Sequence, residues 1–481
     1  MTEYLITFAV VLVHGLAILA LLLSERRHPA ATLAWMFAII FLPFFGMGLY
    51  YAIGARRFRR EAIRAAEATD RAKEAARHLA SADRLPLEEP ASQRTRALLR
   101  LGSRVADRPA SSGNAVQLLV DGAATYEAMT SALNAASDHI HVLFYIIQPD
   151  ETGTALRDLL VARAEEGIEV RILVDDVGSS KLPSDFFDPI RRAGGSAAVF
   201  KRVRWLYVRA RWRDRFDFRN HRKIVVVDGR IGFTGGINIG REYLGLDPER
   251  GDWRDTHVQV EGPAVNALQR VFSSDWFQAT RQTLSDDRYY PEFEKPLPGD
   301  CLTQVVGSGP DFDWSPISHI FTHCIALARE RVWIANPYFV PGLPMRHALV
   351  TAALRGVDVR LLLPGRPDSL VVYWASRSYF KELLEAGARI FLYQRGFLHA
   401  KTMLADSWVA TIGSANLDMR SFYLNFELNL FVYGRRTVEQ LARQFEEDLG
   451  NASEITLEQE RSMGFPRRLL CSSARLMSPL L

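Results

Sequence analysis

An internal repeat constrains the fold of this chain more than any other feature of its sequence. "RNHRKIVVVDGRIGFTGGIN" (219–238) and "GFLHAKTMLADSWVATIGSAN" (396–416) carry the same residue types at the same spacing. Each copy has a histidine, a lysine two residues later and an aspartate five residues after that: His221, Lys223 and Asp228, then His399, Lys401 and Asp406. Such a pattern arises by chance in on the order of one chain in ten thousand of this length. We therefore interpret the segments as two copies of one functional motif.

Each motif has the chemistry of an anion-binding site. Because side chains alternate along a strand, a histidine and a lysine two residues apart project from the same face. The Gly-x-x-Asn turn that follows presents backbone N–H groups and an amide, and the second copy adds a serine hydroxyl. If the two copies face each other, two histidines and two lysines converge on one phosphate. The candidate phosphate-binding residues in these turns are Asn238, Ser414 and Asn416.

The flanking sequence predicts two similar α/β units. "EEGIEVRILVDD" (165–176) resembles "LRGVDVRLLLPG" (354–365), and in both a helix-like stretch precedes an apolar strand. Helices that alternate with apolar strands predict a sheet covered on both faces, and duplicated units usually associate about a pseudo-two-fold axis. The predicted fold class is α/β, with two α/β/α sandwich units. Proline and glycine in "YPEFEKPLPG" place the boundary between a unit of residues 113–292 and a unit of residues 293–481.

The first 54 residues are predicted to form a transmembrane helical hairpin. Leu5–Leu23 is an uncharged run, and Ala30–Ile53 is a second apolar run with aromatic residues near its ends. A signal peptide fits less well, because no basic segment precedes the first run and another run follows it. Proline and glycine in the second run leave open a kinked or re-entrant segment.

Arginines around these runs predict the orientation of the chain. Two follow the first run and five follow the second: Arg26 and Arg27, then Arg56, Arg57, Arg59, Arg60 and Arg64. The larger cluster favours a cytoplasmic location for everything after the hairpin. Residues 55–112 are predicted to form a basic helix and a linker, either at the membrane surface or merely solvated.

Composition adds bounds rather than an identity. The chain has 481 residues, of which 48% are hydrophobic and 24% charged, so most of it belongs to the globular class. Its net charge of +4 is too small to identify a partner. Three scattered cysteines suit neither a disulfide framework nor a zinc site, which favours a reducing compartment and predicts no metal.

Two basic segments are candidates for membrane contact. "KRVRWLYVRARWRDRFDFRNH" (201–221) mixes arginines with aromatic residues, a composition that suits anionic headgroups but also nucleic acid. The predicted hairpin favours lipid, because a tethered enzyme meets its own bilayer first, and no nucleic-acid partner is expected. The tail "FPRRLLCSSARLMSPLL" (465–481) is either a second membrane contact or a packed terminal helix.

The paired H-x-K-x4-D-x6-G-S/G-x-N motif resembles that of the phospholipase D superfamily. The two apolar runs and phrases such as "FYIIQPDETG", "WRDTHVQVEGPAV", "NPYFVP" and "RSFYLNFELNLFVYG" are similar to those of the bacterial cardiolipin synthases, over nearly the entire chain. The resemblance implies two phospholipase D-like units and an enzyme embedded in the bacterial inner membrane. It also implies that the enzyme joins two phosphatidylglycerol molecules into cardiolipin and releases glycerol.

The resemblance further implies chemistry through a phosphohistidine with no metal or other cofactor. One imidazole attacks phosphorus while the other protonates the departing alcohol and later deprotonates the acceptor. We assign His221 as the nucleophile and His399 as the acid and base, although the reverse assignment stays open. The residues expected to neutralise the phosphoryl oxygens are Lys223, Lys401, Asn238 and Asn416.

The carboxylates divide into two groups by the same resemblance. Asp228 and Asp406 belong to the motifs, but their family counterparts look structural. Asp255 and Glu427 match the downstream carboxylates that orient the histidines, and such a partner fixes the tautomer of an imidazole. The alternative for Asp255 is a surface ion pair with Arg254.

Several alternatives remain at this level. The chain could hydrolyse phospholipids, transfer phosphatidyl groups to another alcohol, cleave nucleic acid while tethered to the membrane, or be an inactive lipid-binding scaffold. The oligomeric state and the acyl-chain preference are not encoded in any pattern. Where the second motif has Ser414, the first has Gly236, and we expect Gly236→Ser to be milder than Ser414→Ala.

Overall fold

The computed structural model describes residues 29–42, 93–106, 109–200, 218–247, 251–312 and 314–478, with a few more positions in the first 50. Most of the predicted run Leu5–Leu23, the arginines around the two runs and residues 201–217 of the basic aromatic segment lie outside the described residues. Helix α2 (Pro29–Phe41), which has 13 residues, overlaps the first part of the second predicted run. Among the described residues, no helix combines the length and the apolar character that crossing a bilayer requires.

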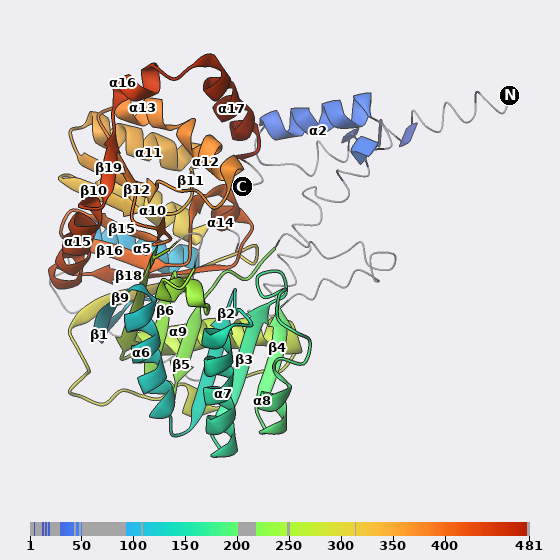
Figure 1. Ribbon diagram of the computed structural model, residues 1–481, viewed down its shortest axis with the longest axis vertical. Coiled ribbons are helices and arrows are strands. Elements are labelled where there is room, and N and C mark those ends of the chain that lie inside the picture. Colours follow the sequence, from blue (N-terminus) through green and yellow to red (C-terminus); the bar gives the residue numbers. More distant parts are fainter. Residues whose placement is uncertain are drawn as a thin grey trace.

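Fifteen of the strands form one continuous sheet, to which both units contribute (Figure 1). From its outer edge inward, the first unit contributes β4 (Ser196–Phe200), β3 (Glu169–Asp175), β2 (His139–Phe144), β5 (Ile224–Val227), β6 (Ile231–Gly235), β8 (Thr256–Glu261) and β1 (Ser111–Val120). The second continues with β9 (Cys301–Ser308), β18 (Glu427–Tyr433), β16 (Val409–Gly413), β15 (Thr402–Ala405), β10 (Arg331–Ala335), β12 (Asp358–Pro364), β13 (Arg389–Tyr393) and β19 (Ala452–Ile455).

The order of the strands repeats on either side of the junction between β1 and β9, which pair antiparallel. In each unit three parallel strands are followed by antiparallel strands that carry the motif: β4, β3 and β2 precede β5, and β13, β12 and β10 precede β15. The prediction of two repeated α/β units is therefore confirmed.

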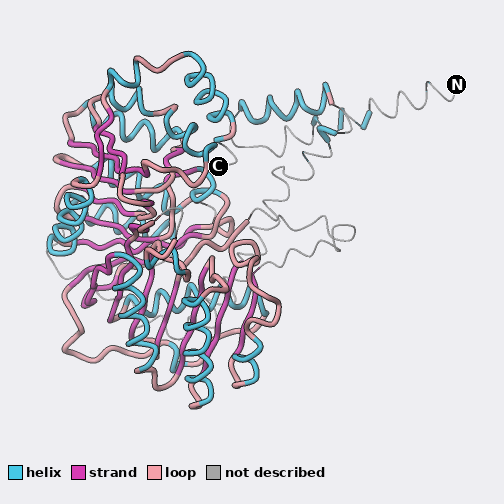
Figure 2. The backbone as a smooth tube through the Cα atoms, viewed as in Figure 1, coloured by secondary structure: helices cyan, strands magenta, loops and turns pink. Residues whose placement is uncertain are grey.

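Helices cover both faces of this sheet (Figures 1 and 2). The first unit has α6 (Asp121–Asn134), α7 (Glu151–Glu165) and α8 (Asp188–Arg192) on one face and α9 (Ala264–Thr280) on the other. The second unit has α10 (Pro316–Leu327), α11 (Leu343–Leu354), α12 (Leu370–Arg377) and α13 (Phe380–Glu385), with α15 (Arg435–Leu449) on the opposite face. Helix α5 (Gln93–Ala106) packs against α10 and β9.

Buried β-branched residues explain why the motif strands lie at the centre of the sheet. All four residues of β5 are buried, and they alternate between two cores: Val225 and Val227 pack under α6 to α8, and Ile224 and Val226 pack under α9. The core under α9 continues under α15 of the second unit. The two units thus share one hydrophobic core as well as one sheet.

The motif aspartates hold turns at the far ends of the motif strands. Asp228 follows β5, and its carboxylate accepts hydrogen bonds from the backbone N–H groups of Ser137, Asp138 and His139 at 2.8 to 2.9 Å. Asp406 does the same before β10, where it also pairs with the Arg94 guanidinium at 2.6 Å. Burial alone would raise the pKa of both carboxyls, but the backbone donors outweigh it and lower the pKa.

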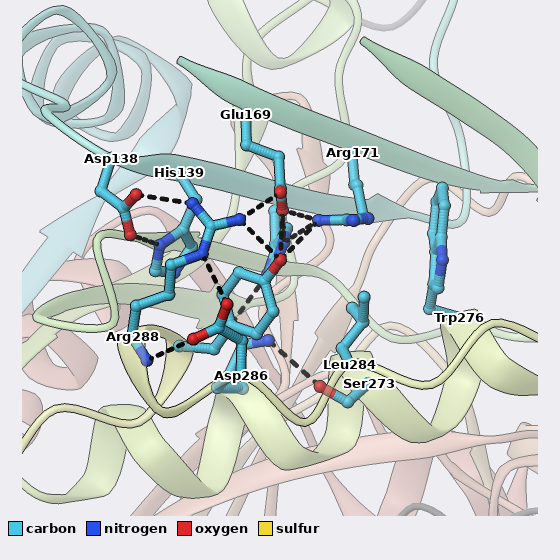
Figure 3. Close-up of polar contacts among 12 residues, drawn as sticks. Asp138, His139, Glu169, Arg171, Ser273, Trp276, Leu284, Asp286 and Arg288 are labelled. Carbon is cyan, nitrogen blue, oxygen red and sulfur yellow. Dashed lines mark hydrogen bonds and ion pairs between the residues drawn. The ribbon is translucent and has the colours of Figure 1, made fainter.

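A cluster of ion pairs fastens the connection between the units to the base of the first unit (Figure 3). Arg288, in the 3-10 helix η3 (Asp287–Tyr289), pairs with Asp138 at 2.8 Å and with Glu169 at 2.5 Å. The Tyr289 hydroxyl donates to the other oxygen of Glu169 at 2.7 Å. The chain is therefore anchored at the start of β2 and β3 before it crosses to β9.

Candidate active site

The two motif histidines lie just before the strands that their patterns predict. β5 begins one residue after Lys223, and β15 begins one residue after Lys401, so histidine and lysine occupy the segments that lead into the strands. The His221 amide donates to the Phe426 carbonyl at 2.9 Å, and the His399 amide donates to the Arg254 carbonyl at 2.8 Å. Each histidine is thus held by the backbone of the other unit.

The orienting carboxylates cross between the units in the same way. Glu427 of the second unit lies against His221 of the first, with 3.0 Å between Nδ1 and Oε2. Asp255 of the first unit lies against His399 of the second, with 2.6 Å between Nδ1 and Oδ2. Both carboxylates are fully buried. The sequence proposes Asp255 and Glu427 as carboxylates that orient the histidines. The structure places each of them against a histidine, and in both pairs the carboxylate and the histidine belong to different units.

The hydrogen bonds at Nδ1 favour the same tautomer in both rings. Burial alone would raise the pKa of Glu427 and of Asp255, but the nearby lysine ammonium groups and the hydrogen bonds that each carboxylate accepts outweigh it and hold the pKa below its usual value, so both stay ionised. A carboxylate can only accept, so each Nδ1 donates and each Nε2 is left without its proton. His221 and His399 both line the cleft between the units. The arrangement supplies two neutral imidazoles able to attack or to take up a proton.

The surface ion pair considered for Asp255 is excluded. The Arg254 guanidinium bonds the Asp448 carboxylate at 2.8 Å and reaches only the backbone carbonyl of Asp255. The Asp255 carboxylate instead accepts from the Thr256 amide at 2.7 Å. Its two oxygens are therefore held by a backbone donor and an imidazole.

Both motif lysines are buried, and each lies beside the histidine of its own motif. The Lys223 ammonium donates to the His221 carbonyl at 2.6 Å, and that of Lys401 donates to the His399 carbonyl. Burial, with the repulsion from Lys401, lowers the pKa of Lys223 to about 7, and burial lowers that of Lys401 to about 8. Burial and the Lys401 charge also lower the pKa of His399 to about 3. An anion placed between these groups would favour their charged forms.

The predicted phosphate-binding residues fall into two groups. Asn238 and Asn416 line the cleft, and the buried amide oxygen of Asn416 has no partner among the described residues. The Ser414 hydroxyl is not directed at the cleft. It donates to Glu427 at 2.5 Å and accepts from the Leu428 amide at 2.9 Å, so the expectation that it binds phosphate is corrected to a contact that holds the carboxylate of the His221 pair.

Asp228 and Asp406 are not part of this site. Each motif strand separates its aspartate from its histidine, and both carboxylates are saturated with backbone donors. Their inclusion among the catalytic candidates is corrected to a role in holding turns.

The surroundings of Gly236 argue against the expectation that Gly236→Ser is milder than Ser414→Ala. A Cβ atom at Gly236 would lie 2.1 Å from one oxygen of Asp255 and 2.7 Å from the other. The first unit therefore pairs a glycine with a short carboxylate, whereas the second pairs Ser414 with the longer Glu427. The first motif lacks the hydroxyl because the Asp255 carboxylate occupies the space that a side chain at position 236 would need.

Aromatic side chains that the motifs do not include complete the site. The Tyr145 ring meets His221 edge to face at 4.8 Å, and the Trp253 ring lies 5.3 Å from that of His399. The Tyr243 hydroxyl lies 3.4 Å from His399 Nδ1 and accepts a hydrogen bond from Asn238 at 2.9 Å. Tyr145 and Trp253 stand in the phrases "FYII" and "WRDTH", which carry the family resemblance, but no sequence signal points to Tyr243.

The cleft between the units has a volume of about 940 Å³. Its wall around the histidines is rich in carboxylates and includes three basic residues: Asp150, Glu151, Glu242, Asp247, Asp368 and Asp418, with Lys181, Arg241 and Arg420. Burial raises the pKa of Asp418 to about 6. Within the described ranges, no group of three or more His, Cys, Asp and Glu side chains is arranged to hold a metal ion.

Comparison with known proteins agrees with this geometry. The family model described as "Cardiolipin synthase, PLD-like domain" matches residues 129–276 and again residues 321–449. A second model, "Phospholipase_D-nuclease N-terminal", matches residues 14–54.

Curated relatives cover almost the whole chain. It is 40% identical to a cardiolipin synthase of Halalkalibacterium halodurans over 95% of this chain and 90% of the relative. It is 37% identical to the major cardiolipin synthase of Bacillus subtilis over 95% of both chains. Among solved structures, a phosphatidylserine synthase of Haemophilus influenzae matches 80% of this chain and all of its own, with a TM-score of 0.61 and 13% identity, which supports the fold alone. The chain belongs to the cardiolipin synthase family of the phospholipase D superfamily.

Proposed function

We propose that this chain transfers a phosphatidyl group from one phosphatidylglycerol molecule to another and so makes cardiolipin and glycerol. The observation that carries the proposal is the pair of imidazoles in one cleft, each backed by a buried carboxylate of the opposite unit, with two buried lysines beside them. Membership of the cardiolipin synthase family supplies the substrate class.

In the first step, Nε2 of His221 attacks phosphorus and forms an N–P bond while the bond from phosphorus to the glycerol headgroup oxygen breaks. His399, protonated once the phosphodiester is bound, gives its Nε2 proton to that oxygen, and glycerol leaves. Glu427 stabilises the positive charge that develops on the His221 ring. The assignment of His221 as nucleophile follows the order of the motifs in the family.

In the second step, a headgroup hydroxyl of another phosphatidylglycerol gives its proton to His399 and attacks phosphorus. The N–P bond breaks, and cardiolipin is released with both histidines in their starting forms. Lys223 and Lys401 neutralise charge on the phosphoryl oxygens in both steps, and Asn238 and Asn416 position them. A cleft of about 940 Å³ at the upper end of the usual range for ligand sites suits a donor and an acceptor headgroup together.

We also propose that residues 1–54 form a hairpin in the bacterial inner membrane and that the catalytic units lie in the cytoplasm. The apolar composition of Leu5–Leu23, the match to the N-terminal family model and the exposed Phe37 and Phe41 of α2 support this. A cysteine-labelling map that places residues beyond 113 outside the cell would refute the orientation.

The function is tested with the purified full-length chain and phosphatidylglycerol vesicles, in the presence of a chelator. We expect cardiolipin and glycerol in equal amounts. Phosphatidic acid as the main product would indicate hydrolysis, and cleavage of DNA without lipid turnover would indicate a nuclease. Activity that disappears with the chelator and returns with a divalent cation would refute the metal-free chemistry.

The histidine assignment has its own test. His221→Ala and His399→Ala are both expected to abolish cardiolipin synthesis. With a substrate whose leaving group departs without protonation, only His221→Ala should also abolish the covalent intermediate. Loss of the intermediate in His399→Ala alone would reverse the assignment.

A further inference from the structure

The terminal helix α17 (Phe465–Leu476) packs with its small residues and exposes its large ones. Cys471 is buried, Ala474 is partly buried, and the Ser478 hydroxyl just beyond the helix lies 3.1 Å from that of Tyr379. The opposite face carries the bulk of the apolar side chains. Their exposed fractions are 70% for Phe465, 55% for Leu469 and 81% for Leu476.

This arrangement is the reverse of that of an ordinary surface helix. Large apolar residues normally face the core, and polar residues face water. Phe465, Leu469 and Leu476 share one face, because their spacing of four and then seven residues follows the helical repeat. Leu470 and Met477 extend the exposed apolar surface to one side. The stability of the fold does not explain why these side chains are large.

The apolar surface continues on a second helix at the mouth of the cleft. α17 packs against α12, whose first turn exposes Leu370 and Val371. The next residue, Val372, lines the cleft, as does Asp368 just before the helix. We call this surface, made of Leu370, Val371, Phe465, Leu469 and Leu476, the α12–α17 face. It extends from the terminal helix to the opening of the cleft.

The charges beside this face select its partner. Arg468 is exposed beside the apolar stripe, and no carboxylate among the described residues pairs with it. Arg475 is also exposed, and its guanidinium lies over the Tyr379 ring at 4.9 Å. Arginines that flank an exposed apolar stripe match a surface with anionic groups above an apolar layer, which is the composition of an anionic bilayer. In Figure 1, α17 and the apolar helix α2 lie on the same side of the molecule.

We propose that the α12–α17 face inserts its apolar side chains into the surface of an anionic bilayer and holds the cleft mouth against it. The inference rests on the proposed function in one respect, that the cleft receives lipid headgroups. The consequence is that a headgroup enters the cleft past Leu370 and Val371 while its acyl chains stay among lipids. The face adds a contact separate from the predicted hairpin, at the opposite end of the chain.

Depth measurements test this proposal without any need for turnover. An environment-sensitive fluorophore is attached at Leu469→Cys in the full-length chain, with Cys301→Ser to remove the only half-buried cysteine among the described residues. The matched control is Leu354→Cys, because Leu354 is 69% exposed and ends α11 near the starts of β10 and β12, away from the cleft. We expect a blue shift and quenching by nitroxide-labelled lipids at position 469 only, stronger in vesicles with phosphatidylglycerol than in phosphatidylcholine alone.

Two outcomes overturn the proposal. A probe at position 469 that reports water in both kinds of vesicle means that this face does not touch the membrane. A blue shift without quenching by lipid nitroxides means that a second copy of the chain covers the face instead. Either outcome stands whether or not the protein makes cardiolipin, so it is separate from failure of the proposed function.

A kinetic comparison tests the consequence for catalysis. The double variant Leu469→Glu, Leu476→Glu is compared with Leu354→Glu on vesicle-borne phosphatidylglycerol and on a short-chain phosphatidylglycerol dissolved as monomers. We expect the double variant to lose about tenfold or more in activity on vesicles, since two leucines that the bilayer would bury are exchanged for charges. Its activity on the soluble substrate, and that of Leu354→Glu on both, should be unchanged. An equal loss on both substrates would mean that the face supports the fold rather than membrane contact.

Discussion

The substitution Gly236→Ser makes the first motif match the second, and the structure predicts that it nearly abolishes activity. The added Cβ would lie 2.1 Å from Asp255 Oδ1, whereas ordinary contacts begin near 3.4 Å, so the carboxylate has to move by roughly 1 Å. It has no free direction, because one oxygen accepts from the Thr256 amide and the other lies 2.6 Å from His399 Nδ1. A displacement of about 1 Å at a catalytic group costs roughly 100-fold in rate.

Stability and the partial reactions separate this effect from misfolding. Overpacking of a buried site costs about 1 to 3 kcal/mol, so we expect Gly236→Ser to fold and to unfold at a slightly lower denaturant concentration. Gly236→Ala should behave alike, since the clash comes from Cβ and not from the hydroxyl. Both should still form the covalent intermediate from a substrate with a good leaving group, because Asp255 acts on His399 and not on the nucleophile.

Ser414→Ala is the matched comparison. It removes one hydrogen bond to Glu427 and leaves the Leu428 amide without its acceptor, at a cost of about 1 to 3 kcal/mol. We expect a loss of about tenfold, milder than that of Gly236→Ser and located in formation of the intermediate. Synthesis of cardiolipin by Gly236→Ser at close to the rate of the unsubstituted chain would refute the reasoning.

Three further outcomes follow from the geometry. Asp255→Asn should slow protonation of the leaving group, and Glu427→Gln should slow formation of the intermediate. Each loss should reach up to about 10⁴-fold, as in other carboxylate–imidazole pairs. Single-turnover kinetics measure both steps, and an exchange of the two defects would argue against the crossed arrangement. Asp406→Ala should lower the free energy of unfolding by about 3 kcal/mol or more, measured by urea denaturation, because several buried N–H groups lose their acceptor; an unchanged midpoint would contradict this. Lys223 and Lys401 act as ammonium ions, and their pKa values are lowered to about 7 and about 8, so kcat/KM should fall as pH rises through that range. The fall in kcat should lie at higher pH, because bound phosphate raises both pKa values. A kcat/KM that stays flat to about pH 9 would argue against the charged lysines.

The sequence predicts the repeated units because the same spacing occurs twice and the apolar strands are long enough to be buried on both faces. It predicts His221 and His399 for the first of these reasons, whereas Asp255 and Glu427 are implied only by the family resemblance. The pairing of these groups across the units is not encoded locally. It depends on β1 meeting β9 at the centre of the sheet, a contact between segments far apart in the chain.

Other errors have similar physical causes. A motif groups residues by distance along the chain, but a strand places the residues before and after it at opposite ends of the sheet. Asp228 therefore shares a motif with His221 without sharing its site. Ser414 has the right chemistry for phosphate, yet Glu427 takes its hydroxyl. Gly236 reads as a missing donor, although its significance is the volume that it leaves to Asp255. Volume and competition for donors become visible only in three dimensions.

Because the carboxylates cross between the units, a substitution in one unit affects the catalytic histidine of the other. A substitution at Asp255 changes neither motif, but it removes the carboxylate that holds His399. The defect therefore appears in the second unit, whose sequence is unaltered. Two defective chains could restore each other only by exchanging whole units, and a half expressed alone would present an imidazole with no partner. Within each unit two residues must change together: Gly236 with Asp255, and Ser414 with Glu427. Selection acts on each pair through the histidine that its carboxylate holds, which belongs to the other unit. The two copies are therefore free to diverge in detail but not to separate.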